Sequence, residues 1–460
     1  EHITQPLYEA AARGVFARCA QWGRAHTDRT GIQQIKPVFP PATAVRDVLA
    51  LGNWPQLPTL TGIVQCPTFS AEGKLHATYG YNTETQLFNA TRLHLGDIQP
   101  IEKNIRMAKR LLFDELLVDF PFDSQASRAH ALALLLLPFV RPMIDGPTPL
   151  HAIDSPTPGT GKGLLANVCS YPARGRDLAS TPAAQDDSEW RKRLTASILR
   201  SDSHVLIDNI NQPLDSASFA LALTQSVWAD RLLGQTCTVT LPITQVWAAT
   251  GNNLVVSDEI ARRAIRIRLD ANVERPDQRL TFKHDNLMQW VRGNRSLLVS
   301  AALTLINAWV QAGMPRYTAK RKGSYEAWTE VIGGILNTVN VVGFLENEHE
   351  MYEAATTETV PLVEFIDAWH ERYGEEEVRP KELFQLASKP DGPVPLGEIG
   401  LWQGLLDDTL GAGNERSRRT KFGLLLESNR DKVICGYKLV KNLSDKKRPR
   451  FSLHKVLHDN

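Results

Sequence analysis

The fold is decided by the stretch Ser155-Pro156-Thr157-Pro158-Gly159-Thr160-Gly161-Lys162-Gly163-Leu164-Leu165. The apolar run Leu150–Asp154 before it predicts a strand, and we expect a helix to begin at Lys162. Glycines let backbone N–H groups close around phosphate oxygens, and the helix N-terminus adds positive partial charge. The stretch therefore predicts a phosphate-binding loop in which Lys162 contacts the β- and γ-phosphates of a nucleotide. The expected loop residues are Pro158, Gly159, Thr160, Gly161, Lys162, Gly163 and Leu164.

Two positions depart from the usual pattern of such loops, which is G-x-x-x-x-G-K followed by Ser or Thr. Pro156 stands where the first glycine belongs, and Gly163 stands where a hydroxyl would bind Mg²⁺. Without that hydroxyl, Mg²⁺ must be held by other side chains, substrate oxygens and water. The alternative is a glycine-rich turn between strand and helix that leaves Lys162 exposed.

A second apolar run, Val205-Leu206-Ile207-Asp208-Asn209, ends in an acid and an amide. A strand that ends in Asp predicts that Asp208 holds Mg²⁺ through water. Asn209 stands where many ATPases carry a Glu that activates the attacking water. An amide orients water but cannot accept its proton. Either Glu189 or Asp187 serves as the base, or hydrolysis is slow.

A third run, Val246-Trp247-Ala248-Ala249-Thr250-Gly251-Asn252-Asn253, ends in two amides. A polar amide at the end of the strand beside Asp208 can contact the γ-phosphate and the attacking water. We expect Asn252 in this role, with Asn253 as the alternative. Gly-Asn-Asn is also favourable turn chemistry, so an ordinary turn is the competing interpretation.

Two arginines, Arg262 and Arg263, precede the predicted strand Ala264–Leu269. Arginines at this position can lie at a subunit edge and contact the γ-phosphate of a neighbour, as an arginine finger acting in trans. The alternative is a pair of structural or solvated arginines. Arg266 and Arg268 alternate with apolar residues on one face of the strand, which favours a structural role.

The alternation of short apolar runs and helical segments over residues 147–275 predicts an α/β fold with a parallel sheet. The remaining predicted strands of this sheet are His204–Asp208 and Gln245–Thr250. The longest apolar run, Ala129–Val140, is too short to cross a membrane, because a span needs about 20 residues. We therefore expect a buried helix there and no membrane partner.

Composition excludes disorder but says little about partners. Lys+Arg 52 against Asp+Glu 51 gives a net charge of +1, so any nucleic-acid signal must be local. The odd, scattered set of cysteines predicts reduced thiols and a cytoplasmic location. These cysteines are Cys19, Cys66, Cys169, Cys237 and Cys435. The chain begins with Glu1 rather than Met, so we expect a piece of a longer protein.

A basic C-terminal segment is interleaved with apolar residues, which predicts a small domain rather than a tail. A helix over Thr420–Asn429 and strands over Lys432–Lys441 and Arg450–His454 are typical of a winged-helix unit. Its basic turn would neutralise DNA phosphates. The alternative is a solvated or subunit-docking surface. The predicted DNA-binding residues are Lys446, Lys447, Arg448 and Arg450.

These observations predict four regions. Residues 1–100 form a mixed α/β module, and residues 101–345 form the ATPase core with an N-terminal helical collar and a C-terminal helical lid. Residues 346–414 form an acidic helical linker, and residues 415–460 form the basic winged-helix-like domain.

The order of motifs resembles the AAA+ ATPase core of primase-helicases encoded by phages, plasmids and integrated mobile elements, which are relatives of superfamily-3 helicases. The resemblance covers residues 110–345, about half of the chain. The matching stretches are Thr157–Leu165, Glu189–Leu194, Val205–Asn209, Trp228–Gly234, Trp247–Leu254 and Asp258–Asp270.

The resemblance implies rings, usually hexamers, that bind ATP and Mg²⁺ at each subunit interface and translocate on DNA. It places Lys162, Asp208 and Asn252 in cis, and Arg262 or Arg263 in trans. It also implies a primase domain N-terminal to this region. Inside such a ring, residues 231–244 would form a channel-facing hairpin or an ordinary crossover.

Two functions remain open from the sequence. The first is an ATP-driven ring helicase or translocase in the replication of a mobile element. The second is a weakly hydrolysing AAA+ origin-binding or loader factor that uses ATP as a clamp, which Asn209 and Gly163 favour. A small-molecule kinase would not explain Arg262, Arg263 or the basic C-terminal segment.

Overall fold

The computed structural model describes residues 7–27, 29, 31–52, 54–231, 238–273, 275–279, 282–350, 360–390, 403–434, 436–442 and 449–456. The chain folds into two compact units, Glu1–Met351 and Tyr352–Asn460. Each unit is described by itself. Among the described residues, no helix combines the length and the apolar character that crossing a membrane requires.

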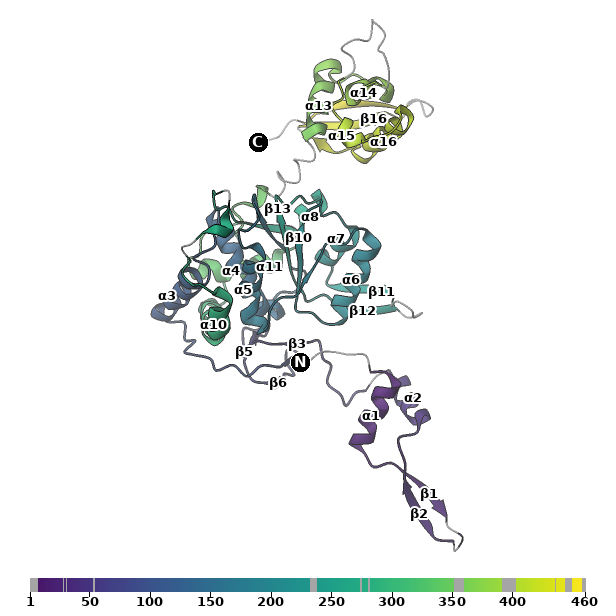
Figure 1. The fold of residues 1–460 in the computed structure, drawn as a ribbon, viewed down its shortest axis with the longest axis vertical. Helices are drawn as coiled ribbons and strands as arrows, with labels where there is room; N and C mark the ends of the chain where they lie inside the picture. The colour runs from purple at the N-terminus through teal and green to yellow at the C-terminus, as the bar shows by residue number, and fades with distance from the viewer. Residues whose placement is uncertain are drawn as a thin grey trace. The chain divides into compact units, whose positions relative to one another are not determined.

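The centre of the first unit is a five-stranded, all-parallel sheet in the order β14-β8-β13-β10-β9. Figure 1 labels β13 and β10, two neighbouring strands of this sheet. Every residue of β8 is buried, as expected for a central parallel strand covered on both faces. The predicted parallel sheet is confirmed, and each predicted strand overlaps its observed counterpart. The strands are β8 (Leu150–Ser155), β9 (Ser180–Thr181), β10 (His204–Ile210), β13 (Val246–Asn252) and β14 (Ala264–Arg268).

Helices cover the sheet and form one large apolar core with it. The predicted buried helix is α4 (Gln125–Val140), whose N-cap Ser124 accepts a hydrogen bond from the backbone of Ser127. Its Ala and Leu residues are buried all round because it packs against α5, α11 and β14. The other helices of this core are α3 (Glu102–Arg110), the π-helical η1 (Leu111–Leu116), the 3-10 helix η2 (Arg141–Met143), α5 (Lys162–Arg174), α9 (Leu287–Gly293), α10 (Arg295–Gln311) and α11 (Glu326–Thr338).

A second group of helices packs near β10 and β13 through aromatic contacts. Trp190 of α6 (Asp187–Leu199) stacks on Phe219 of α7 (Ala217–Thr224) with ring centroids 5.0 Å apart. Phe219 in turn meets Trp247 of β13 edge-on. The short helix α8 (Asp258–Ala261) follows β13 and leads into β14.

The segment between α7 and β13 contains a β-hairpin. Strand β11 (Val227–Arg231) pairs antiparallel with β12 (Thr238–Pro242), so that Arg231 lies opposite Thr238. Residues 227–242 thus contain a hairpin, and the channel-facing role that we predicted for residues 231–244 stays a prediction. Residues 232–237, at its tip, lie outside the described part of the chain.

The N-terminal region consists of small elements. These are α1 (Glu9–Cys19), β1 (Gly23–Thr27), β2 (Gln33–Pro37), α2 (Ala42–Ala50), β3 (Gly62–Val64), β4 (Thr68–Phe69), β5 (Leu75–His76), β6 (Gly80–Tyr81) and β7 (Leu87–Asn89). Cys66 and Phe69 belong to the same apolar core as α4 and α10. The core therefore includes residues from the region 1–100 that we predicted as a separate module.

The second unit joins segments that we predicted as separate. Its helices are α13 (Val360–Tyr373), α14 (Pro380–Ala387), α15 (Asp407–Leu410) and α16 (Glu415–Ser428). Phe365 and Phe384, from the predicted acidic linker 346–414, pack against Phe422 of the basic segment. The structure thus divides the chain after Met351, close to the boundary that we predicted after residue 345, and it joins the regions that we predicted on either side of residue 415, because the acidic residues lie on helices whose other faces are apolar.

A three-stranded antiparallel sheet completes this unit, in the order β15-β16-β17. Its strands are β15 (Val433–Ile434), β16 (Tyr437–Asn442) and β17 (Arg450–Lys455). The single strand that we predicted over Lys432–Lys441 is instead a tight hairpin, because Gly436 has a left-handed φ of 80°. Arg450 begins β17 opposite Asn442. Lys446, Lys447 and Arg448 lie outside the described residues.

Candidate functional site

The predicted phosphate loop connects the end of β8 to the start of α5, which begins at Lys162 as expected. Gly159 and Gly161 have φ values of 80° and 90°, a left-handed conformation that only glycine adopts without strain. Gly161 caps α5, and the first N–H groups of a helix have no partner within it. The loop thus presents backbone donors and the positive end of the helix dipole, which together favour an anion.

The Lys162 side chain crosses from α5 to the end of β13. Its Nζ donates to Ser155 Oγ and to Asn252 Oδ1, both at 2.6 Å. Burial lowers the pKa of Lys162, while Asp154 and Asp208 raise it. The ammonium is therefore directed at oxygen acceptors at the carboxyl edge of the sheet, where a phosphate oxygen can replace them.

The two candidate amides have different positions. The side chain of Asn252 meets Lys162, whereas the backbone N–H of Asn253 donates to Ser155 O at 2.9 Å. Asn253 has a φ of 42°, which bends the chain away from the strand. The structure therefore brings Asn252, the amide that we expected near the γ-phosphate, into contact with Lys162. The backbone of Asn253 instead connects the end of β13 to Ser155, at the start of the loop.

Asp208 lies where β10 is irregular. The pairing of β10 with β13 shifts register between Ile207 and Ile210, and Asn209 has a φ of 57°. The Thr250 hydroxyl donates to Asp208 Oδ1 at 2.5 Å and accepts from the Asn209 N–H at 2.9 Å. Thr250 is 2% exposed, so this hydroxyl has a fixed position and orients the Asp208 carboxylate.

Thr250 was missed as a functional residue from the sequence. It stands in an apolar run and carries no motif. Only the strand register places it beside Asp208, and that register could not be predicted.

Gly163, the position that lacks the usual hydroxyl, faces the same carboxylate. A Cβ added there would lie 3.7 Å from Asp208 Oδ1 and 3.9 Å from Oδ2. The loop position and Asp208 therefore flank one small space. A cation in that space would be held by Asp208, by water and by phosphate oxygens.

The carboxylates that we considered as general bases are engaged elsewhere. Asp187 accepts hydrogen bonds from the hydroxyls of Ser216 and Ser218, both at 2.7 Å, and these bonds lower its pKa. Glu189 pairs with Arg193 at 3.0 Å, which lowers its pKa in the same way. A lowered pKa makes each a weaker base, so neither is poised to accept a proton. The Asn209 side chain is exposed at the end of β10.

The structure separates the two candidate arginines. Arg263 Nε donates to Thr224 Oγ1 at 2.6 Å and Nη1 donates to Glu259 O at 2.5 Å, so its guanidinium joins α7 to α8 within the chain. Arg262 is exposed, and its side chain has no hydrogen bond or ion pair with any described residue. Arg262 is therefore the arginine that is available to another molecule.

A buried group of ion pairs lies at the end of β8, directly before the phosphate loop. Asp154 Oδ2 accepts from Arg266 at 2.7 Å and from Arg268 at 2.5 Å, while Oδ1 accepts from the Leu254 N–H at 2.8 Å. Asp154 is 2% exposed, and a buried carboxylate needs such partners. The geometry agrees with the structural role that we predicted for Arg266 and Arg268.

Comparisons with known proteins give limited information. No family model and no curated protein matches the sequence. Among solved structures, one match is a crystal structure of JCV helicase with a bound small molecule, at 13% identity and a TM-score of 0.22. The match covers 56% of this chain and 72% of that chain. At such a low score, the function must be argued from the residues of this chain.

Proposed function

We propose that this chain is an ATP-dependent, ring-forming DNA helicase or translocase that acts in the replication of a phage, plasmid or other mobile element. The observation that carries the proposal is the meeting of Lys162, Asn252 and Asp208 at the carboxyl ends of three adjacent parallel strands. This meeting occurs beside the N-terminus of α5. Ligands of open α/β sheets bind at this edge.

In the proposed site, the backbone of loop residues 158–164 surrounds the phosphates of ATP, and Lys162 contacts the β- and γ-phosphates. Asn252 contacts the γ-phosphate, and Asn209 orients the attacking water. The residues fit Mg²⁺, because the Asp208 carboxylate is held in place by Thr250 and faces the space beside Gly163. Bound Mg²⁺ would neutralise charge that develops on the phosphate oxygens.

The proposal places each site between two copies of the chain. Arg262 extends from one copy to the γ-phosphate held by the next, which agrees with its exposure and its lack of partners among the described residues. A hexameric ring and an N-terminal primase domain follow from the resemblance to AAA+ primase-helicases, and a cytoplasmic location follows from the scattered cysteines. DNA contacts are proposed for Lys446, Lys447, Arg448 and Arg450 of the second unit.

A second function is favoured by one specific observation. Asn209 replaces the expected base, and Asp187 and Glu189 are held by other residues with lowered pKa values. These features suit a weakly hydrolysing AAA+ loader or origin-binding factor in which ATP clamps subunits together.

Displacement of a labelled strand from a forked DNA duplex tests the first function. The helicase should displace the strand with ATP, and a Lys162→Ala chain should not. A clamp would bind DNA and assemble in ATP without displacing any strand, and that result would replace the first function with the second.

The variant Asn209→Glu separates the two functions further, because it supplies a carboxylate where the clamp lacks one. If the chain is a clamp, we expect turnover to rise by roughly 10²-fold, the typical effect of a positioned base. If another group already serves as the base, turnover should stay level or fall. Asn209→Ala is the matched control, because it changes the same position without adding a base.

A further inference from the structure

Strands β1 and β2 form a two-stranded hairpin (Figure 1), which we call the N-terminal ribbon. Its base is fixed, because the Val38 N–H donates to Trp22 O at 2.9 Å and Trp22 Nε1 donates to Phe16 O of α1 at 3.0 Å. Every residue of both strands is nevertheless exposed. A two-stranded hairpin is at best marginally stable in water by itself, so an uncovered ribbon gains stability when a partner binds it.

The register of the ribbon gathers four hydrogen-bonding side chains on one face. Arg24 lies opposite Lys36, and His26 lies opposite Gln34. Paired residues of antiparallel strands share a face, and successive residues alternate between the two faces. These four residues therefore form one face, which we call the basic face. The strand residues of the other face carry no charge.

Arg24 and Lys36 are like charges that lie directly opposite each other, and such a pair destabilises a hairpin. Both side chains are exposed, and neither forms a hydrogen bond or an ion pair with a described residue. The described part of the chain therefore does not offset the repulsion between them. An anion bound to both cations would remove it.

The segment around the ribbon adds to this positive charge. Residues 10–46 contain six arginines and lysines and one acidic residue, Asp28. Asp28 lies outside the described residues, and the Arg29 that follows it is exposed. Because the net charge of the whole chain is only +1, the excess of positive charge is local to this segment.

The composition of the basic face favours nucleic acid over protein as the partner. Its arginine, lysine, histidine and glutamine are hydrogen-bonding residues, and it has no aromatic ring or aliphatic side chain that would anchor a protein. Protein–protein interfaces have an apolar core that is depleted in lysine. Protein–DNA interfaces are more polar and much more positively charged.

The shape of the ribbon favours duplex DNA over a single strand. The major groove of B-DNA admits a two-stranded β-ribbon, whose side chains then lie near base edges and phosphates. Single-strand sites instead stack the bases on aromatic side chains. The basic face has no Phe, Tyr or Trp, so it lacks the groups that stacking requires.

We propose that the N-terminal ribbon binds duplex DNA through its basic face, with Arg24 and Lys36 contacting phosphates. This surface shares no residue with the proposed ATP site or with the basic residues near the C-terminus. Its binding needs no nucleotide, so the proposal does not rest on the motor function.

Fluorescence anisotropy of the full chain without nucleotide tests the proposal. The probes are a labelled duplex of about two helical turns and its labelled single strand. The ribbon variant, Arg24→Ala with Lys36→Ala, should weaken duplex binding by about 10-fold. It should also reduce the slope of log K against log salt by about 2, because two phosphate contacts are lost. Single-strand binding should not change.

The matched control is Lys103→Ala with Arg106→Ala. These cations of α3 are exposed and have no hydrogen bond or ion pair with a described residue, so the control removes the same charge from another surface. It should leave duplex binding unchanged. Lys162→Ala should also bind the duplex like the wild-type chain, so failure of the ATP site and failure of this proposal are distinguishable.

Thermal unfolding checks that the ribbon variant is folded. Its melting temperature should not fall, because the substitutions remove two opposed like charges. Arg24→Lys provides a second comparison, because it keeps the charge and should keep most of the duplex affinity.

Four outcomes would overturn the proposal. The first is a wild-type chain that does not bind the duplex, or a ribbon variant that binds it equally well. The second is an equal loss in the ribbon and control variants, which would show an effect of total charge. The third is an equal loss of duplex and single-strand binding. The fourth is binding of poly-L-glutamate to the ribbon as tightly as the duplex, which would indicate an acidic protein partner.

Discussion

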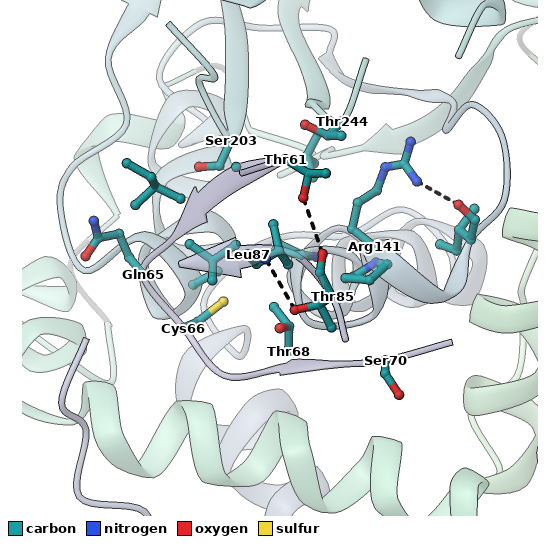
Figure 2. Close-up of a pocket in the computed structure, with 18 of the residues that line it drawn as sticks. Thr61, Gln65, Cys66, Thr68, Ser70, Thr85, Leu87, Arg141, Ser203 and Thr244 are labelled. Atoms are coloured by element: carbon teal, nitrogen blue, oxygen red, sulfur yellow. Dashed lines mark hydrogen bonds between the residues drawn. The ribbon is translucent and has the colours of Figure 1, made fainter. Parts of the chain in front are cut away.

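The two ends of the central sheet differ in how the chain builds them. At the carboxyl ends, Asp208 and Asn252 lie in the last residues of β10 and β13, and Lys162 follows β8 after one loop, so the topology of a parallel sheet brings them together. At the amino ends, a cavity is lined by Arg141, His204 and residues of β3 and β7, which no single motif connects (Figure 2). The difference teaches that a site made at strand ends can be found from sequence, whereas a site between packed segments needs the structure.

The two ends also differ in how their charges are held. At the carboxyl ends, each charged group has polar partners within the chain, such as Lys162 with Asn252 and Asp208 with Thr250. At the amino ends, Arg141 has carbonyl partners but no contacting carboxylate among the described residues. Substitutions at the carboxyl edge should therefore change ATP turnover.

After Lys162, the largest effect is expected from Arg262. Arg262→Ala should lower DNA-stimulated ATP turnover by roughly 10³-fold, the lower range for an arginine finger, without changing the melting temperature. Arg263→Ala should instead lower the melting temperature, because its bonds to Thr224 and Glu259 join α7 to α8. Turnover assays and thermal unfolding of both variants check this. The opposite pattern would assign the trans role to Arg263.

A smaller effect is expected from Thr250. Thr250→Val should lower turnover by about 10-fold and raise the Mg²⁺ concentration needed for half-maximal rate, because Asp208 loses a charge-assisted hydrogen bond. Thr250→Ser keeps the hydroxyl and should restore both quantities. If Thr250→Val and Thr250→Ser behave alike, the hydroxyl does not position Asp208.

At Gly163, we expect a substitution to improve the response to Mg²⁺ rather than to weaken it. Gly163→Ser should lower the Mg²⁺ concentration for half-maximal turnover by about 3-fold, since one added hydroxyl ligand contributes about as much as one hydrogen bond. The added Cβ meets Asp208 at ordinary contact distance, so the substitution should fold. Gly163→Ala is the matched control. An equal change in both variants would show an effect of the helix rather than of the hydroxyl.

The smallest effect on turnover is expected at Asp187. Asp187→Asn should leave ATP turnover within about 2-fold, because this carboxylate caps α7 rather than serving as the base. The variant should lose about 0.5–1 kcal/mol of folding free energy at pH 7, a modest value because the carboxylate is exposed.

The pH dependence of Asp187 follows from the direction of its shift. Its folded pKa lies below its unfolded value, so the stabilisation is present above the unfolded pKa and is lost as pH falls through the folded pKa. The stability difference between the wild-type and Asp187→Asn chains should therefore shrink below about pH 4 in denaturant titrations. A large loss of turnover in Asp187→Asn would instead make Asp187 the base.

The sequence predicted the parallel sheet and placed Lys162, Asp208 and Asn252 at its carboxyl edge, because strand ends and glycine loops are local patterns. Thr250 could not be assigned, since its role depends on which residues of β10 and β13 lie opposite each other. The choice between Arg262 and Arg263 depended on which guanidinium is bonded within the chain. The shared core of the second unit was missed because acidic composition masked the apolar faces of α13 and α14.

The most direct test is ATP turnover by the wild-type and Lys162→Ala chains, with and without single-stranded DNA, beside a mass measurement with ATP present. The account predicts that DNA stimulates wild-type turnover, that the wild-type mass is that of a ring, and that Lys162→Ala reduces turnover to background. Turnover that survives Lys162→Ala would contradict the assignment of the site. Turnover that no DNA changes would contradict the motor function.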